Sequence, residues 1–250
     1  MEDQPHSHVR LDLVTDLSGT LAALEVFRAA WGRSDVQDVD TYFAAASHGS
    51  YLAVGRLAGE PVVAAFGFLS VDPVTGEPGL HSHMAAVVPP AADKGFGQLI
   101  KRHQRDWCAE RGIQAITWTF DPLQRRNAWF NLVRLGATVI GFRRNLYGSL
   151  DDQINGTDET DRLEVRWLVD PSDGAGTVAA LDGDEVVAVP ADIGALRRKD
   201  PGLAAAARER MRVAFAGIEE GTHTVVGMSL DREYVVRPNP TRPVALYPSC

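Results

Sequence analysis

The 250-residue chain has little cysteine, no long apolar run and no excess of basic residues. Its two cysteines, Cys108 and Cys250, are too few for a disulfide framework or a CxxC metal site. No segment approaches the ~20 apolar residues that a membrane-spanning helix needs. The formal charge of −8 argues against a general nucleic-acid binder, because phosphate backbones favour basic surfaces. The first ten residues (MEDQPHSHVR) lack an apolar signal-peptide core, so we expect a cytoplasmic protein with no membrane or nucleic-acid partner.

The hydrophobic pattern predicts an α/β core followed by a smaller extension. Strands are expected at 9–14, 50–57, 61–71, 113–120, 137–147 and 162–169. Ala58-Gly59-Glu60 predicts a hairpin between 50–57 and 61–71, and 162–169 is expected to pair antiparallel with 137–147. Helices are expected at 18–31 with Ser18 as N-cap, after Asp40, at 97–111 and from Asn127 to Leu135. The segment PSDGAG (171–176) marks a boundary. Beyond it we expect short strands at 177–181, 185–189, 222–229 and 233–237, and a helix near 192–219 interrupted around Asp200-Pro201. The predicted division is 1–170 and 171–250.

The stretch at 80–99 (LHSHMAAVVPPAADKGFGQL) carries the clearest chemical motif. It reads as a strand, a proline break, a Gly-x-Gly turn and the start of a helix. Gly95 and Gly97 lie where backbone N–H groups of a helix N-terminus point outward and attract an anion. Lys94, Lys101, Arg102 and Arg105 lie around and just after this turn and suggest a local basic pocket. The alternative is an ordinary strand-to-helix turn that binds nothing.

Two histidines, His81 and His83, stand just upstream of that turn. Strict alternation puts both on one face of the strand, with Ser82 and Met84 on the other. Histidine titrates near neutral pH and can accept the proton that an ammonium group must lose before it attacks a thioester. The alternative is that both histidines only pack or hydrogen-bond within the sheet.

The order of elements, with Val87-Val88-Pro89 followed by Gly95-Phe96-Gly97, resembles the GCN5-related N-acetyltransferase (GNAT) superfamily over residues 9–169. The stretch WTFDPLQRRNAWFNLVRLGA (118–137) is similar to a little-characterised bacterial branch with a C-terminal extension. The resemblance implies a mixed, splayed β-sheet flanked by helices, with a smaller α+β extension at the C-terminus. It also implies that the chain binds acetyl-CoA or another acyl-CoA and needs no metal.

Carried over residue by residue, the resemblance assigns the pyrophosphate to main-chain amides at 92–97 and the pantetheine arm to Val87 and Val88. The cofactor-binding residues are then Val87, Val88, Ala92, Asp93, Lys94, Gly95, Phe96, Gly97 and Asn127. The H-x-H pair is similar to that of arylalkylamine N-acetyltransferases, where such histidines act as the base, and His83 is the first choice here because it lies nearer the thioester end.

Two positions depart from the usual pattern. Ala92 replaces the Arg or Gln that begins the phosphate loop, and Leu132 replaces the Tyr that often serves as general acid, which leaves water or Tyr147 for that role.

The acceptor side is expected from Trp118, Asp121, Arg125 and Arg126, where Asn127 also lies. Either arginine could recognise a carboxylate. The alternatives are a solvated loop for the Asp and Arg residues, an N-cap role for Asn127 and core packing for Trp118 or Trp129.

The favoured function is transfer of an acetyl or other short acyl group from acyl-CoA to a small-molecule amine or amino acid by direct attack. Two alternatives stay open: an acyl-CoA enzyme of another type, such as a decarboxylase, and a non-catalytic acyl-CoA sensor or partner module. Residues 171–250 could cover the acceptor site, extend the sheet or form the interface of a homodimer.

Overall fold

The computed structural model describes residues 9–32, 39–148, 158–170 and 176–239. By their internal contacts these residues form two compact units, and each is described by itself. The N-terminal unit comprises residues 1–72 and 76–116, and the C-terminal unit comprises residues 73–75 and 117–250. Most of the expected 171–176 boundary, and also Cys250, lie outside the described residues. The division at 170/171 therefore stays a prediction.

Four antiparallel strands form the sheet of the N-terminal unit, in the order β1-β2-β3-β4. They are β1 (Val9–Leu13), β2 (Tyr51–Leu57), β3 (Glu60–Val71) and β4 (Pro78–Val87). A tight hairpin joins β2 to β3, and its two turn residues, Ala58 and Gly59, both have positive φ angles (51° and 91°). That backbone twist matches the twist of the flanking strands, as the expected hairpin requires.

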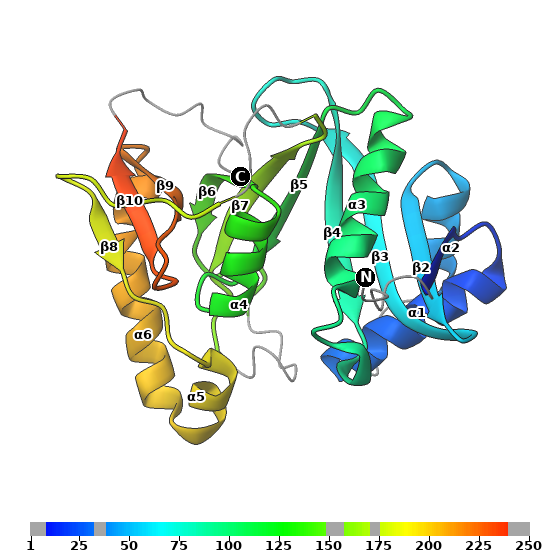
Figure 1. Ribbon diagram of the computed structural model, residues 1–250, viewed down its shortest axis with the longest axis horizontal. Coiled ribbons are helices and arrows are strands. Elements are labelled where there is room, and N and C mark those ends of the chain that lie inside the picture. The colour runs from blue at the N-terminus through cyan, green and yellow to red at the C-terminus, as the bar shows by residue number, and fades with distance from the viewer. Residues whose placement is uncertain (1–8, 33–38, 149–157, 171–175, 240–250) are drawn as a thin grey trace, which may run out of the picture. The chain divides into compact units, whose positions relative to one another are not determined.

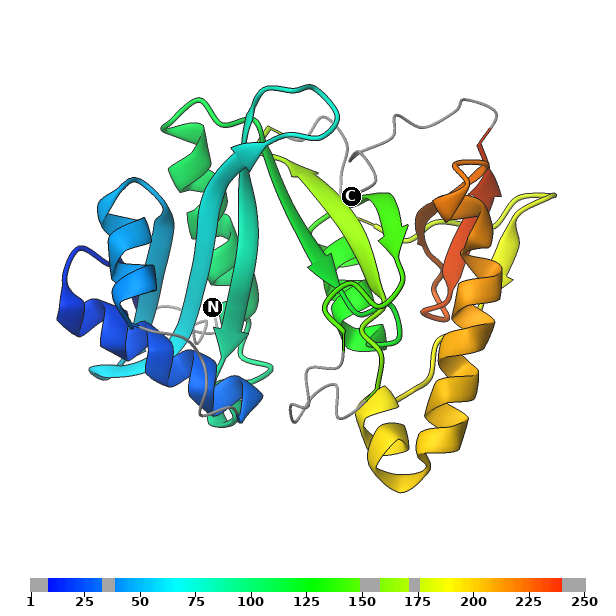
Figure 2. The same ribbon diagram turned by 180° about the vertical axis from the view of Figure 1, so that it is seen from behind.

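Helices cover both faces of this sheet (Figures 1 and 2). On one face lie α1 (Leu17–Trp31) and α2 (Val39–Ser47), and on the other lies α3 (Phe96–Ala109). The α1/α2 face buries a cluster that includes Leu24, Phe27, Tyr42 and Phe66. The α3 face buries Tyr51, whose ring meets Trp107 edge-on at 5.4 Å. Cys108 is buried there too, as a small apolar side chain should be.

The N-cap of α1 is Asp16 and not the expected Ser18. The Asp16 carboxylate accepts a hydrogen bond from the Gly19 N–H at 2.7 Å. Its extended backbone (φ −141°, ψ 169°) is the usual N-cap conformation. The helix starts one residue earlier than expected because Leu17 already has helical geometry.

β5 (Ala115–Phe120) belongs to the C-terminal unit from Thr117 onward, and β5, β7 (Arg162–Leu168) and β6 (Thr138–Arg143) are neighbours in that order. β6 and β7 pair antiparallel, as the sequence predicts. Between β5 and β6 the chain forms α4 (Arg125–Ala128) and a π-helical turn, η3 (Trp129–Arg134), and Gly136 follows with φ 73°.

The rest of the C-terminal unit is a three-stranded antiparallel sheet with helices, in the strand order β8-β10-β9. Its strands are β8 (Glu185–Val187), β9 (His223–Met228) and β10 (Tyr234–Pro238). The strand expected at 177–181 is not formed, although the Val178 N–H donates to the Met228 carbonyl at 2.9 Å. The expected interrupted helix is three helices: α5 (Ile193–Lys199), α6 (Pro201–Ala214) and α7 (Ala216–Glu219). Asp200 caps α6, and Pro201 occupies its first position, which explains the interruption.

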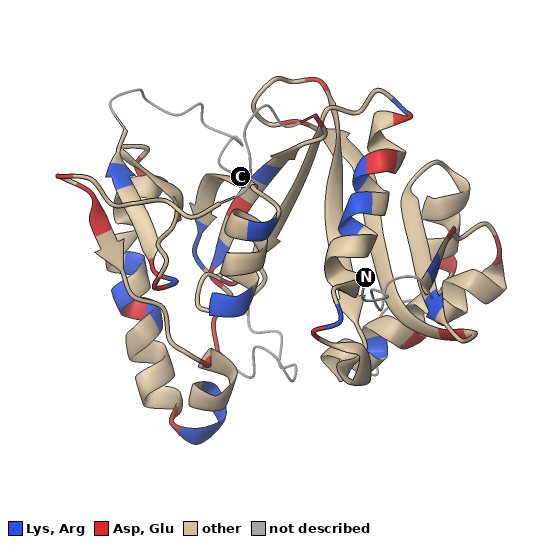
Figure 3. Ribbon diagram, viewed as in Figure 1, with Lys and Arg blue, Asp and Glu red and all other residues tan. Residues whose placement is uncertain are grey.

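Aromatic packing joins this part of the chain to the strands before it. Phe215 meets Phe142 of β6 and Tyr234 of β10 edge-on at 5.4 and 5.3 Å. The buried Tyr234 hydroxyl donates to the Pro122 carbonyl at 2.8 Å. The charged side chains of α5 and α6 lie in the C-terminal half of each helix (Figure 3). Those of α5 are all basic, and those of α6 are Arg208, Glu209, Arg210 and Arg212. The extension therefore shares its core with β6 and the segment after β5.

Candidate active site

Strand β4 contains a bulge at the histidine pair. Phe66 of β3 faces Met84, and Phe68 faces His81, so Ser82 and His83 together lie opposite the single residue Gly67. A Cβ atom at Gly67 would lie 2.9 Å from the His81 carbonyl oxygen. Glycine at this position therefore lets the two strands stay paired across the bulge.

The bulge changes which side chains share a face. Ser82 lies beneath α3, where its hydroxyl accepts a hydrogen bond from Lys101 at 2.8 Å. Met84 lies on the α1/α2 face, where its sulfur accepts a hydrogen bond from the Tyr42 hydroxyl at 2.9 Å. The placement of Ser82 opposite the histidines is confirmed. That of Met84 is wrong, because the extra residue in the bulge shifts the alternation after His83.

His81 and His83 lie side by side with two phenylalanines of β3. The two imidazole centroids are 6.0 Å apart. The Phe68 ring lies 5.0 Å from His81 and 5.7 Å from His83, and the Phe66 ring lies 6.5 Å from His83. The pair is therefore set in an aromatic surface, with His83 exposed and His81 half-buried.

This surface weakens the proton affinity of both histidines. Burial lowers the pKa of His81 to about 4, with smaller contributions from the charges of His83 and Lys101. Burial also lowers the pKa of His83. Because each pKa lies below its usual value of about 6.5, both imidazoles are neutral near pH 7 and can accept a proton. A group with a pKa near 4 is a poor proton acceptor at that pH, which disfavours His81 as the base.

The chain between β4 and α3 makes a short loop with two left-handed residues. Val88 follows β4 and precedes a 3-10 turn, η2 (Pro89–Ala91). The Ala92 N–H donates to the Pro89 carbonyl at 3.1 Å and so is part of that turn. Asp93 has φ +64°, and Gly95, the N-cap of α3, has φ +80°. Glycine tolerates that angle without strain.

The N-terminus of α3 suits an anion. No side chain caps the helix, and no acidic residue lies in its first turn. The first-turn amides of a helix have no acceptor within the helix, and the helix dipole places partial positive charge there. Asp93, Lys94 and Gly95 are exposed, whereas the Phe96 side chain is buried and anchors the turn. Gly97 is half-buried within α3.

Comparison with known proteins gives fold-level matches. The structure is similar to the ribosomal-protein-S18-alanine N-acetyltransferase of Escherichia coli, with a TM-score of 0.53 and 14% identity over 66% of this chain and 96% of that one. It is also similar to a GNAT-family acetyltransferase from Elizabethkingia anophelis with acetyl-CoA bound (TM-score 0.51, 12% identity, 64% and 98% covered). A third match is Naa50 of Arabidopsis thaliana in complex with a bisubstrate analogue (TM-score 0.50, 19% identity, 64% and 97% covered). No protein-family model and no curated protein matches the sequence.

The chain has the GNAT fold. The expected α/β fold class, a GNAT-like sheet flanked by helices, is thereby confirmed. The likeness covers about two thirds of the chain, which leaves the remaining third without a counterpart in the solved structures named above.

In this GNAT-fold chain, the residues expected on the acceptor side lie in the C-terminal unit. Trp118 of β5 is buried, donates through Nε1 to the Asn131 side-chain oxygen at 3.3 Å and meets Trp167 edge-on at 6.2 Å. Trp118 is therefore a core residue. Trp129 is half-buried, with the Arg232 guanidinium 5.1 Å from its ring centroid.

The Asp121 carboxylate is bound from within the C-terminal unit. It accepts hydrogen bonds from the Leu123 N–H and from the Arg197 guanidinium of α5, both at 2.8 Å. The Asp121 and Arg197 side chains are each only 7% exposed. Of the neighbouring residues expected at the site, Arg125 is half-buried, and Arg126 and Asn127 are exposed. Sequence reasoning did not find Arg197, because 76 residues separate it from Asp121.

Asn127 is not an N-cap. It is the third residue of α4, and Gln124 occupies the cap position. Further along, Leu132 is buried within the π-helical turn, so no hydroxyl is presented from that residue. The Tyr147 hydroxyl, the other candidate for general acid, is hydrogen-bonded with the Thr119 hydroxyl at 3.2 Å.

Lys101 is not part of a surface basic pocket. Its side chain lies in the N-terminal unit between α3 and β4, with only 4% of the residue exposed. The helical spacing from Lys101 to the buried Gln104 and Cys108 places it on the inward face of α3. That spacing could have identified it in the sequence.

Metal-binding clusters and membrane-spanning helices are both absent from the described residues. Among them, no group of His, Cys, Asp or Glu side chains could hold a metal ion. None of the described helices combines the length and the apolar character needed to cross a membrane.

Proposed function

We propose that this chain is a coenzyme A-dependent N-acyltransferase. It would move an acetyl or other short acyl group from acyl-CoA to the amine of a small molecule or amino acid. The observation that carries the proposal is a pair of adjacent histidines on β4, with a glycine-capped helix N-terminus at the end of the loop after that strand, in a GNAT fold. Solved proteins of this fold include one with acetyl-CoA bound and one named as an N-acetyltransferase, which supports the assignment.

The loop after β4 would hold the cofactor. The amides from Asp93 to Gly97 suit a pyrophosphate, because Gly95 carries no side chain and α3 lacks an acidic first turn. Val87 and Val88, both half-buried at the end of β4, would lie along the pantetheine arm. Lys94, exposed in the loop, would supply the positive charge that Ala92 cannot. When bound, acyl-CoA supplies a thioester that an amine can attack.

His83 would act as the general base. It is exposed, its imidazole is neutral near pH 7, and its pKa is less affected by neighbouring charges than that of His81. A neutral imidazole can take the proton that the attacking amine must lose. His81, beside both Phe68 and His83, would hold the His83 ring in place or relay the proton through water.

The acceptor would be recognised from α4. Arg125 and Arg126 stand in its first turn, and either can bind a carboxylate of an amino-acid acceptor. Asp121 and Trp118 would support the acceptor site and not bind the acceptor themselves. Arg197 already binds the Asp121 carboxylate, and the Trp118 indole already donates to Asn131.

The test is thiol release from acetyl-CoA against a panel of amines, with the acylated amine identified by mass spectrometry. We expect His83→Ala to lower kcat by roughly 100-fold or more, the usual effect of losing a general base. His48→Ala, at an exposed histidine at the end of α2, is the matched control and should retain full activity. No thiol release with any amine would contradict the proposal, and release of carbon dioxide from malonyl-CoA would instead favour a decarboxylase.

A further inference from the structure

A buried polar cluster lies beneath the histidine pair, on the opposite face of β4. Lys101 of α3 donates from Nζ to the Ser82 hydroxyl at 2.8 Å and to the Gln104 side-chain oxygen at 3.2 Å. All three residues are almost fully buried. The amide nitrogen of Gln104 has no hydrogen-bond partner within the described residues, and it lies 3.3 Å from where a Cβ of Gly67 would be.

This cluster is built around the bulge. Ser82 stands between His81 and His83 in the chain and is one of the two residues that face Gly67. Gly67 in turn leaves no room for a side chain against the His81 carbonyl oxygen. The hydrogen bond from Lys101 therefore ends on the residue at which the backbone of β4 departs from regular pairing.

Packing alone does not require a lysine at this position. Burying an ammonium group is costly, and an apolar side chain of similar volume often fills such a space at no loss of stability. Met could occupy the position of Lys101 between α3 and β4 without that cost. The ammonium therefore contributes something that an apolar side chain would not.

We propose that Lys101 is a positioning residue of the candidate active site, which fixes the bulge of β4 through Ser82 and thereby sets the orientation of His81 and His83. Its charge also acts on His81 directly, since Lys101 contributes to the lowered pKa of that imidazole. Apart from Lys101, the titratable group that acts on His81 is His83 on β4. The titratable group that acts on Lys101 is Cys108 on α3. The kinetic part of this inference rests on the proposed function, whereas the effect on histidine titration does not.

The experiment is an NMR pH titration of the imidazoles in the full chain, in wild type and in Lys101→Met. His81→Gln identifies the His81 signal among the seven histidines. We expect Lys101→Met to raise the pKa of His81 part of the way from about 4 towards 6.5, because burial, the larger cause, remains. Arg102→Met removes a like charge from an exposed position next in the same helix and should leave His81 unchanged.

A second variant tests the hydrogen bond and keeps the proposal falsifiable if Lys101→Met does not fold. Ser82→Ala removes the acceptor but keeps the ammonium, and it should shift the signals of both histidines. We expect it to lower kcat on the order of tenfold, with KM for acetyl-CoA little changed, since small misplacements of reacting groups are costly. Ser82→Thr keeps a hydroxyl and should recover most of the activity.

The outcomes separate the two proposals. If a folded Lys101→Met leaves the His81 titration unchanged, or if Ser82→Ala moves neither histidine signal, the positioning role is wrong. If the titrations shift as expected but no variant, including wild type, acylates an amine, the proposed function fails and the control of the histidine pair by Lys101 stands. A loss of kcat in Ser82→Ala that Ser82→Thr restores, together with the expected titration shifts, supports both.

Discussion

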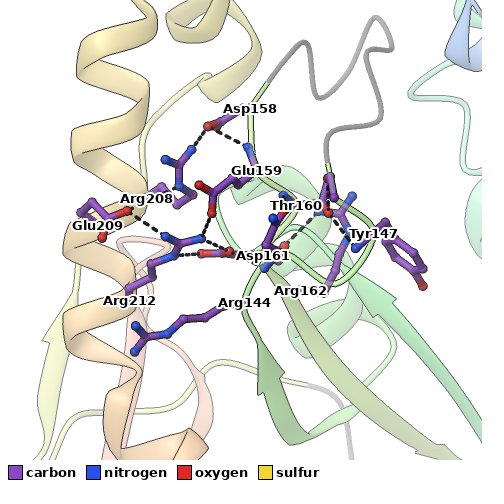
Figure 4. A network of polar contacts seen from close by, with 12 residues as sticks. Arg144, Tyr147, Asp158, Glu159, Thr160, Asp161, Arg162, Arg208, Glu209 and Arg212 are labelled. Carbon is purple, nitrogen blue, oxygen red and sulfur yellow. Dashed lines mark hydrogen bonds and ion pairs between the residues drawn. The ribbon is translucent and has the colours of Figure 1, made fainter. Parts of the chain in front are cut away.

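Arg212 of α6 binds both carboxylate oxygens of Asp161, with Nε–Oδ2 and Nη2–Oδ1 distances of 2.7 Å each (Figure 4). The exposed fractions of the two side chains are 12% and 4%. The same guanidinium contacts Glu159 and Glu209, and Asp161 also accepts from the Asn145 N–H. The pair therefore ties α6 of the extension to the segment that leads into β7.

We expect Arg212→Met to lower the free energy of unfolding by about 3 kcal/mol, because it leaves the buried Asp161 carboxylate without its cation. Arg210→Met, at an exposed position on the same helix, is the control and should change it by less than about 0.5 kcal/mol. Urea unfolding followed by circular dichroism measures both. A value for Arg212→Met as small as that for the control would show that the pair contributes nothing to stability.

The N-terminus of α1 gives a second prediction, in which structure and sequence pattern disagree. Asp16→Ala removes the side chain that accepts from the Gly19 N–H and should cost about 1 kcal/mol of stability. Ser18→Ala, at the cap position favoured by the sequence, lies within the first turn and should cost far less. If thermal unfolding shows Ser18→Ala to be the more damaging change, the assigned cap is wrong.

The fold could be predicted from local signals, because each depends on residues close together in the chain. The break at Asp200-Pro201 is one example, since Pro fits the first turn of a helix and Asp caps it. The hairpin at Ala58-Gly59 is another. The glycine turn at Gly95 is a third example, because a glycine just before an amphipathic segment indicates both a positive φ angle and the start of a helix.

The missed features depend on contacts between distant segments. Nothing near Asp121 indicates that Arg197 will bind its carboxylate, since their pairing follows from how α5 packs. The bulge in β4 depends on Gly67, a residue of the neighbouring strand. Strict alternation therefore placed Met84 on the wrong face, although it placed the two histidines together.

Burial of Lys101 should make stability depend on pH in a way that Lys101→Met removes. Burial lowers the pKa of Lys101 from 10.5 to about 7, so between pH 7 and 10.5 the unfolded chain binds more protons than the folded one. In that range Lys101 makes the free energy of unfolding rise with pH. Below about pH 7 the buried side chain is charged in the folded protein, and the destabilisation that this causes is fully present. The free energy of unfolding of Lys101→Met should therefore exceed that of wild type most at pH 6.5, and by less at pH 8.5.

Urea unfolding of both proteins at the two pH values measures this difference. The Cys108 thiol, whose pKa burial raises to about 12, is common to both proteins and affects them alike. Arg102→Met controls for the loss of one positive charge and should show no such trend. An equal difference between Lys101→Met and wild type at both pH values would mean that Lys101 stays charged in the folded protein.

Gly95 provides the sharpest test of the phosphate loop. Gly95→Ala forces an L-side chain into φ +80° at the start of α3 and should cost about 1 kcal/mol of stability. Gly59→Ala imposes a similar strain at φ +91° in the β2–β3 turn, where a new Cβ meets nothing within 4 Å. Both variants should lose stability alike, but only Gly95→Ala should lose the rise in melting temperature that coenzyme A gives wild type, because ligand stabilisation follows affinity. If Gly95→Ala keeps the full rise, or if millimolar coenzyme A stabilises none of the three proteins, this loop is not where the cofactor binds.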